Sequence, residues 1–155
     1  MCSPPPFAIA KGKKPTAAQR AGLRYEEKAL AHLEGWASAR GYSPLSKQWI
    51  EYRDISGRVM WAEVDQFAIS GDTDNILLFE VKIRHTRDAF KQLGRYKTLL
   101  ASIYPNHHIC PIEICQYFDM EEYKTTILDE IRPHSLPHAA HIWEPSILTT
   151  LVGIN

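Results

Sequence analysis

The chain has 155 residues, of which 45% are hydrophobic and 23% are charged, and its formal net charge is zero. This size suits one domain with its own core, and the composition excludes a largely disordered or fibrous protein. No stretch approaches the roughly 18 apolar residues of a membrane span, no signal-peptide pattern is present, and three cysteines are too few for a disulfide framework, so we expect a cytoplasmic protein.

The first third of the chain begins with a segment, residues 1–15, that is rich in proline and lysine and has no periodicity. This pattern predicts a flexible leader. A helix is predicted over 16–40, because Thr16 can cap it and alanines and leucines dominate its sequence. Gly41 followed by Pro44 is a typical stop signal.

Three strands follow, at 47–53, 58–69 and 76–83, and turn-forming residues separate them. The third is almost continuously apolar, which is typical of a central strand covered on both faces. A second helix is predicted over 86–103, where apolar residues recur at helical spacing. These residues are Ala89, Leu93, Tyr96, Leu100 and Ile103.

A fourth strand is predicted over 108–118, and Pro111 within it favours an edge position or a bulge. Residues 119–155 are interpreted as a C-terminal extension, packed on the core or trailing from it. Within the extension, 121–131 fits either a strand or a helix, and 145–152 fits a short helix. The element order predicts an α/β domain over 16–118 with a mixed four-stranded sheet flanked by helices.

Glu80-Val81-Lys82 is the first candidate for chemistry. Residues two apart on a strand point to the same face, so Glu80 and Lys82 should lie side by side while Val81 joins the core. Two charges on an otherwise apolar strand need an explanation, because lone buried charges are unfavourable. A plain ion pair is one explanation, since short E-x-K tripeptides also occur by chance.

Asp65 lies in the middle of the preceding strand. If the two strands form a hairpin, Asp65 and Glu80 converge at one end of the sheet. Two nearby carboxylates repel each other, and a divalent cation relieves that repulsion. Mg²⁺ suits such oxygen ligands and keeps waters for a substrate phosphate. Lys82 beside it would orient the attacking water and balance charge on the phosphoryl group.

Glu26 belongs to the first helix. Its stripe follows three-and-four spacing and should pack inward, whereas the neighbouring Glu27 shares a solvated face. The stripe comprises Gly22, Glu26, Ala29, Leu30, Leu33 and Ala37. A carboxylate on the inward face needs a partner, unless Glu26 sits at the stripe's edge and reaches solvent.

Together these motifs resemble the PD-(D/E)xK nuclease superfamily, in particular its Holliday-junction-resolvase-like and phage or repair nucleases. The resemblance covers about Arg20 to Cys115. It rests on four elements, which are Gly22-x-x-x-Glu26, Glu63-Val64-Asp65, Glu80-Val81-Lys82, and Gln92 with Tyr96. Val64 replaces the proline of the name-giving motif, a common departure.

The resemblance implies a restriction-endonuclease-like αβββαβ core. It also implies that Asp65, Glu80 and the backbone carbonyl of Val81 bind Mg²⁺, for which Mn²⁺ would substitute. Lys82 would then assist the water, Glu26 would support the metal site, and Gln92 would contact the site or the substrate.

Four basic residues follow the motif at three-and-four spacing, on one face of the second helix. They are Arg84, Arg87, Lys91 and Arg95. We interpret them as contacts to the phosphate backbone of DNA, and a merely solvated helix face explains them equally well. A zinc site built from His107, His108, Cys110 and Cys115 is set aside, because an unbroken strand points the two cysteines to opposite faces.

The sequence therefore predicts a Mg²⁺-dependent nuclease that hydrolyses phosphodiester bonds in DNA. A compact core offers little surface for reading sequence, so we expect structure-specific cleavage, or action as a homodimer or within a larger nuclease complex. Two alternatives stay open. One is a nuclease-fold subunit that binds nucleic acid without cutting it, and the other is a protein-interaction adaptor.

Overall fold

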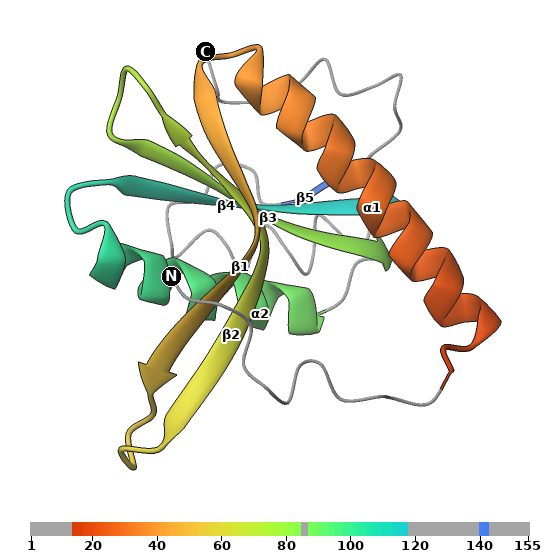
Figure 1. Cartoon of the computed structure of the whole chain (residues 1–155), viewed down its shortest axis with the longest axis horizontal. Helices are drawn as coiled ribbons and strands as arrows, with labels where there is room; N and C mark the ends of the chain where they lie inside the picture. The colour runs from red at the N-terminus through yellow and green to blue at the C-terminus, as the bar shows by residue number, and fades with distance from the viewer. Residues whose placement is uncertain (1–13, 85–86, 118–139, 143–155) are drawn as a thin grey trace.

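The computed structural model describes residues 14–84, 87–117 and 140–142. Its elements are, in order, α1 (Ala17–Ser38), β1 (Tyr42–Arg53), β2 (Val59–Ser70), β3 (Asn75–Arg84), α2 (Arg87–Ile103), β4 (His108–Tyr117) and β5 (Ala140–Ile142). The strand order is β1-β2-β3-β4-β5. The first two pairings are antiparallel and the last two are parallel. The predicted α/β fold with a mixed sheet between helices is confirmed (Figure 1).

Three details differ from the expectations. β1 begins at Tyr42 instead of Lys47, because an edge strand tolerates a proline such as Pro44. A fifth strand, β5, lies beside β4 and falls within the predicted C-terminal extension. Ile103 is exposed, so the buried stripe of α2 ends at Leu100. The other predicted segments, 1–13, 121–131 and 145–152, lie outside the described residues.

Helix α1 begins where its sequence predicts. The Thr16 side chain accepts a hydrogen bond from the Gln19 backbone N–H at 3.2 Å, and the Gln19 side chain accepts one from the Thr16 N–H at 2.8 Å. This capping box satisfies two backbone donors that the first turn leaves unpaired. The helix ends at Ser38, and Gly41, at φ +77°, turns the chain into β1.

Gly41 provides a test of this turn. Gly41→Ala should destabilise the protein by about 1–2 kcal/mol, because an L-residue at positive φ brings its Cβ against the backbone. Gly35→Ala is the matched control. Gly35 lies within α1 with no atom near its potential Cβ, so alanine there should stabilise by about 0.5–1 kcal/mol. Urea denaturation measures both, and equal effects would contradict the role of Gly41.

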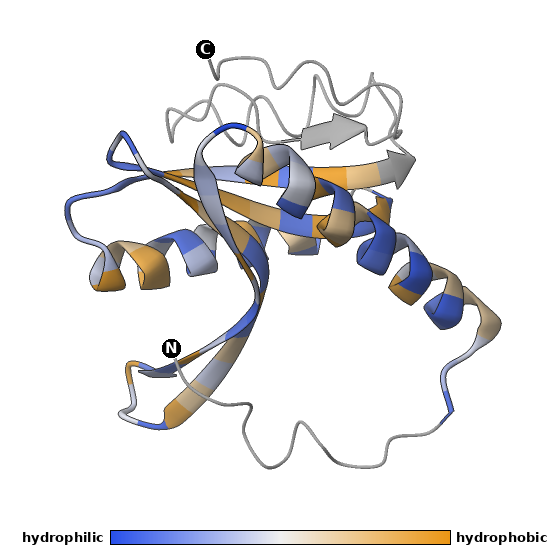
Figure 2. Cartoon of the chain, turned by 45° about the horizontal axis from the view of Figure 1, so that its top comes forward, coloured by the Kyte–Doolittle hydropathy of each residue, from blue (hydrophilic) through white to orange (hydrophobic). Residues whose placement is uncertain are grey.

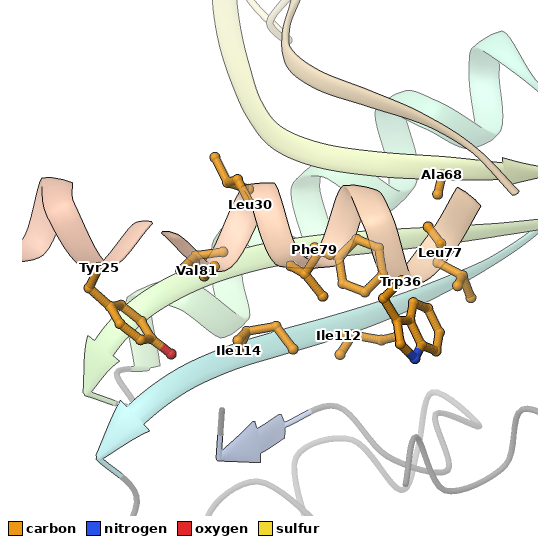
Figure 3. Close-up of a cluster of buried hydrophobic side chains, with 12 residues drawn as sticks. Tyr25, Leu30, Trp36, Ala68, Leu77, Phe79, Val81, Ile112 and Ile114 are labelled. Atoms are coloured by element: carbon orange, nitrogen blue, oxygen red, sulfur yellow. The ribbon is translucent and has the colours of Figure 1, made fainter. Parts of the chain in front are cut away.

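The two faces of the sheet carry separate apolar clusters. The α1 cluster packs buried residues of α1, among them Leu33 and Trp36, against Leu77 and Phe79 of β3 and Ile112 of β4 (Figure 3). The α2 cluster packs α2 against the opposite face. It contains Ile50, Ala62, Val64, Phe67, Ile76, Leu78, Leu93, Tyr96, Leu100 and Ile109.

Strand β3 therefore sends alternate side chains into both clusters, which explains its nearly continuous apolar sequence. Figure 2 shows these apolar residues along the central strands and polar residues along the outer side of α1. Neither described helix combines the length and apolar character needed to cross a membrane.

The sheet divides at one point. The β2–β3 ladder runs from Ile69↔Ile76 to Gln66↔Phe79 and continues no further. The β1–β2 and β3–β4 ladders both extend beyond this position. The outer part of the β1–β2 hairpin thus bends away from β3 (Figure 1). We call the divergence between Asp65 of β2 and Glu80 of β3 the fork.

Candidate active site

Asp65 lies at the fork, where its carboxylate takes the place of a missing ladder bond. Its Oδ2 accepts a hydrogen bond from the backbone N–H of Val81 at 3.1 Å. Val81 is buried, and an unpaired buried N–H would be unfavourable. The side chain of Asp65 is thus fixed beside Glu80, as the hairpin hypothesis requires.

Glu80 and Lys82 lie on one face of β3, as their spacing predicts. The Nζ of Lys82 donates a hydrogen bond to Oε1 of Glu80. The Glu80 side chain is only 2% exposed, whereas that of Lys82 is 32% exposed. The second oxygen of Glu80, Oε2, is buried and has no hydrogen-bond partner within the described part of the chain.

Glu26 reaches the same place from α1. Its Oε1 lies 3.6 Å from Nζ of Lys47, and Glu27 is exposed, as predicted. Burial, followed by the charge of Asp65, raises the pKa of Glu26, while Lys47 and Lys82 lower it. Glu26 is therefore an electrostatic neighbour of the fork residues.

The charge of Asp65 disfavours the ionised forms of both Glu26 and Glu80. Burial and the charge of Asp65 raise the pKa of Glu80 to about 7, against the effect of Lys82. Burial also raises the pKa of Asp65, although the Val81 N–H and both lysines oppose it. Burial lowers the pKa of Lys82, but its hydrogen bond to Glu80 and the nearby carboxylates raise it overall. Lys82 is consequently a cation and a hydrogen-bond donor.

On α2, the residue that reaches the site is Tyr96. Its pKa is raised by burial and then by the charges of Glu80 and Asp65, which indicates that the ring lies near both. Gln92 is half-buried, and its Oε1 has no hydrogen-bond partner among the described residues. No described contact joins Gln92 to the carboxylates, so its role stays a prediction.

Two further residues of the site were missed from the sequence. Glu113 of β4 is 2% exposed, stands in register with Glu80, and raises the pKa of that carboxyl. A single acid inside the apolar run 108–118 was the available signal. Lys47 is the first residue of the predicted strand 47–53, and no local signal in the sequence marks it as a site residue.

Lys47 has an unusual backbone. Its φ is +49°, and it is the one non-glycine residue with positive φ in the described part of the chain. This conformation costs an L-residue about 1–2 kcal/mol. Its partly exposed ion pair with Glu26 contributes about 0–1 kcal/mol, which does not offset the backbone strain.

A pocket of about 410 Å³ lies between the first half of α1 and the end of β3. It brings Glu26 and Lys82 to one surface, so a substrate group can approach them from solvent. Its lining residues are Pro15, Gln19, Gly22, Leu23, Tyr25, Glu26, Val81, Lys82 and Ile83.

The predicted DNA-contacting residues lie at the end of β3 and along α2. Arg84, Lys91 and Arg95 are exposed. Lys91 lies 3.9 Å from Asp88, and the guanidinium of Arg95 lies 5.3 Å from the centre of the Tyr96 ring. Arg95 therefore borders the site, whereas the side chain of Arg87 lies outside the described ones.

The described residues contain no group of three or more His, Cys, Asp and Glu side chains with metal-binding spacing. The two carboxylates at the fork are thus a partial oxygen ligand set, not a closed cage. Cys110 and Cys115 lie on an unbroken stretch of β4, and neither is joined in a disulfide within the part of the chain that the structure describes.

Fold and site together define an α/β protein with paired carboxylates and a lysine at a division of its sheet. No protein-family model matches the chain, and no curated protein matches it. Among solved structures, it is similar to a repair endonuclease from Pyrococcus abyssi, with 20% identity and a TM-score of 0.48 over 88% of this chain and 50% of the other.

It is also similar to EndoMS in an EndoMS-dsDNA2 complex, with 19% identity, a TM-score of 0.48 and coverage of 88% and 49% of the two chains. EndoMS in its apo form gives 18% identity, a TM-score of 0.43 and coverage of 87% and 49%. The chain spans about half the length of these proteins.

Proposed function

We propose that this chain is a Mg²⁺-dependent nuclease of the PD-(D/E)xK superfamily that hydrolyses phosphodiester bonds in DNA. The observation that carries the proposal is the meeting of Asp65, Glu80 and Lys82 at the fork, with Glu26 beside them. These residues come from three different elements. Their side chains share one electrostatic environment.

The residues present fit a hard divalent cation. Asp65 and Glu80 are adjacent and repel each other, and Glu80 Oε2 is a buried oxygen without a hydrogen-bond partner among the described residues. Asp65 and Glu80, with the Val81 carbonyl, would hold Mg²⁺, and Mn²⁺ would substitute. When bound, such a cation polarises a phosphoryl oxygen and acidifies its water.

The protein's own groups divide the remaining work. Lys82 stays protonated beside Glu80, so it would donate hydrogen bonds to the attacking water or to a non-bridging phosphate oxygen, and balance negative charge there. Glu26 would accept a hydrogen bond from water in the adjoining pocket. Water adds to phosphorus, the phosphorus–oxygen ester bond breaks, and the leaving oxygen takes up a proton.

The surroundings of the site support a nucleic-acid substrate. Arg84, Lys91 and Arg95 extend from the end of β3 along α2, and exposed cations of this kind bind backbone phosphates without reading bases. We propose the same role for Arg87. Structure-specific cleavage fits so small a core, alone, as a homodimer or within a larger complex.

The test is a cleavage assay with purified protein on single-stranded, duplex, flapped and four-way-junction DNA. We expect cutting with Mg²⁺ or Mn²⁺, no cutting with EDTA, and a loss of about 100- to 1,000-fold in Lys82→Ala, the range typical of removing one transition-state donor. Lys28→Ala, at an exposed position on α1, is the control. No cutting of any substrate by folded wild-type protein would favour a binding subunit. If calorimetry also shows no Mg²⁺ or Mn²⁺ binding and DNA does not bind, the adaptor alternative is favoured.

A further inference from the structure

The backbone at Lys47 calls for an explanation that involves its side chain. The left-handed region is normally occupied by glycine or asparagine, for which the conformation is less unfavourable. Such residues persist in folded proteins where the surroundings demand them, and they gather at functional sites. The unfavourable φ of +49° at Lys47 therefore points to a function for its side chain.

Lys47 lies opposite Asp65 at a gap in the β1–β2 pairing, and the register is the same on both sides of this gap. Ser46 pairs with Gln66 and Gln48 pairs with Val64, and the two residues between them do not pair. Side-chain alternation changes here on both strands. Leu45 and Ile50 both pack against the α2 cluster, although five positions should place them on opposite faces. On β2, Val64 and Phe67 are three positions apart and should also point to opposite faces, yet both belong to the α2 cluster. The left-handed turn at Lys47 is thus part of the fork.

This turn brings the lysine to the edge of the carboxylate site. Its Nζ lies 3.6 Å from Glu26 Oε1, and its side chain is still 52% exposed. Its charge also lowers the pKa of both Glu26 and Asp65. Lys82 differs in that it is more buried and bound to Glu80. Lys47 therefore keeps solvent-facing donors at the site, and an exposed ion pair with Glu26 is too weak to account for its backbone.

We propose that Lys47 is a substrate-binding residue that holds a backbone phosphate of the nucleic acid, so that two ammonium groups, from Lys47 and Lys82, flank the carboxylates. This inference rests on the proposed function for the nature of its ligand. An ammonium group is well suited to this contact, since it binds phosphate as a point charge.

The test separates the ammonium group from the backbone. Lys47→Gly removes the charge and suits the left-handed turn, so its melting temperature should stay within about 3 °C of wild type, or rise. Lys47→Arg keeps the charge. Lys28→Gln removes a charge from an exposed position of α1 and is the matched control.

Binding of a fluorescent 20-base-pair duplex is measured by anisotropy in EDTA, over a range of salt concentrations. Lys47→Gly should weaken binding about tenfold and reduce the slope of log K against log salt by about one, as expected for one lost phosphate contact. Lys47→Arg should retain most of the affinity, and Lys28→Gln should behave as wild type. In the Mg²⁺ cleavage assay, Lys47→Gly should raise KM more than it lowers kcat.

The outcomes distinguish the two proposals. If wild type binds DNA through Lys47 but does not cut it, the nuclease function fails and the phosphate-binding role of Lys47 stands. If wild type cuts DNA and Lys47→Gly changes neither affinity, salt slope nor KM, the role of Lys47 is overturned. If wild type neither binds nor cuts DNA, both are overturned. A stable Lys47→Gly with weaker binding supports the inference.

Discussion

Replacing Asp65 with asparagine should reduce Mg²⁺-dependent cleavage about a thousandfold while leaving the fold intact. Charge stabilisation by a bound cation is worth several kcal/mol, and each 1.36 kcal/mol is about tenfold in rate. The fold should persist because the asparagine Oδ1 can still accept the hydrogen bond from the Val81 N–H, which Asp65 accepts at 3.1 Å. Cleavage of the best DNA substrate with Mg²⁺ measures the effect, and calorimetry measures the metal affinity.

Glu63→Gln is the matched control for Asp65→Asn. It removes an acid from the same strand two residues earlier, at an exposed position, so cleavage and metal binding should stay close to wild type. An Asp65→Asn protein that still cuts DNA and binds Mg²⁺ normally would refute the assignment of Asp65 as a ligand.

Glu80→Gln should have opposite effects on activity and stability. Cleavage should fall about a thousandfold with the loss of the second carboxylate ligand. The metal-free protein should nevertheless melt about 5 °C higher at pH 8. Glutamine can still accept a hydrogen bond from Lys82. The substitution should stabilise the protein because it removes a buried negative charge that the charges of Asp65 and Glu113 repel. Raising a carboxyl pKa from 4.5 to about 7 corresponds to roughly 3 kcal/mol at high pH.

This effect has a defined pH dependence. Between pH 4.5 and about 7, folded Glu80 retains a proton that the unfolded chain has released. The contribution of Glu80 to stability is therefore lost as the pH rises through this range. Thermal denaturation in EDTA should show the advantage of Glu80→Gln growing from pH 4.5 to 7 and then staying constant.

Glu51→Gln, at an exposed position of β1, should change stability by less than about 0.5 kcal/mol at any pH in this range. A Glu80→Gln protein that is less stable than wild type at pH 8 would show that the Glu80–Lys82 pair stabilises the folded protein. It would also contradict our inference that Asp65 and Glu113 destabilise ionised Glu80. Mg²⁺ should stabilise wild type at pH 8 and have little effect on Glu80→Gln.

Local sequence determined the parts of the fold that depend on neighbouring residues. The capping box at Thr16, the end of α1 before Gly41 and the shared face of Glu80 and Lys82 all follow from contacts within a few positions. The central place of β3 could also be predicted, because burial on both faces requires an apolar residue at nearly every position.

Only the tertiary structure decided where the sheet opens to complete the site. In an unbroken sheet, the ladder separates side chains that point to opposite faces. The fork opens this ladder. The charge of Asp65 therefore raises the pKa of both Glu26 of α1 and Tyr96 of α2, although these helices pack on opposite faces of the sheet. No local pattern predicts where a ladder ends.

Lys47 illustrates the same limit most clearly. A lysine in a strand-like segment carries no sign of a left-handed backbone, because that conformation is imposed by its surroundings and not by its own preference. Glu113 likewise gains its importance from its register with Glu80 across a parallel pairing of distant segments. The sequence by itself determined the elements and the identity of the charged motif. Long-range pairing, which depends on how the strands meet in space, decided which other groups surround that motif.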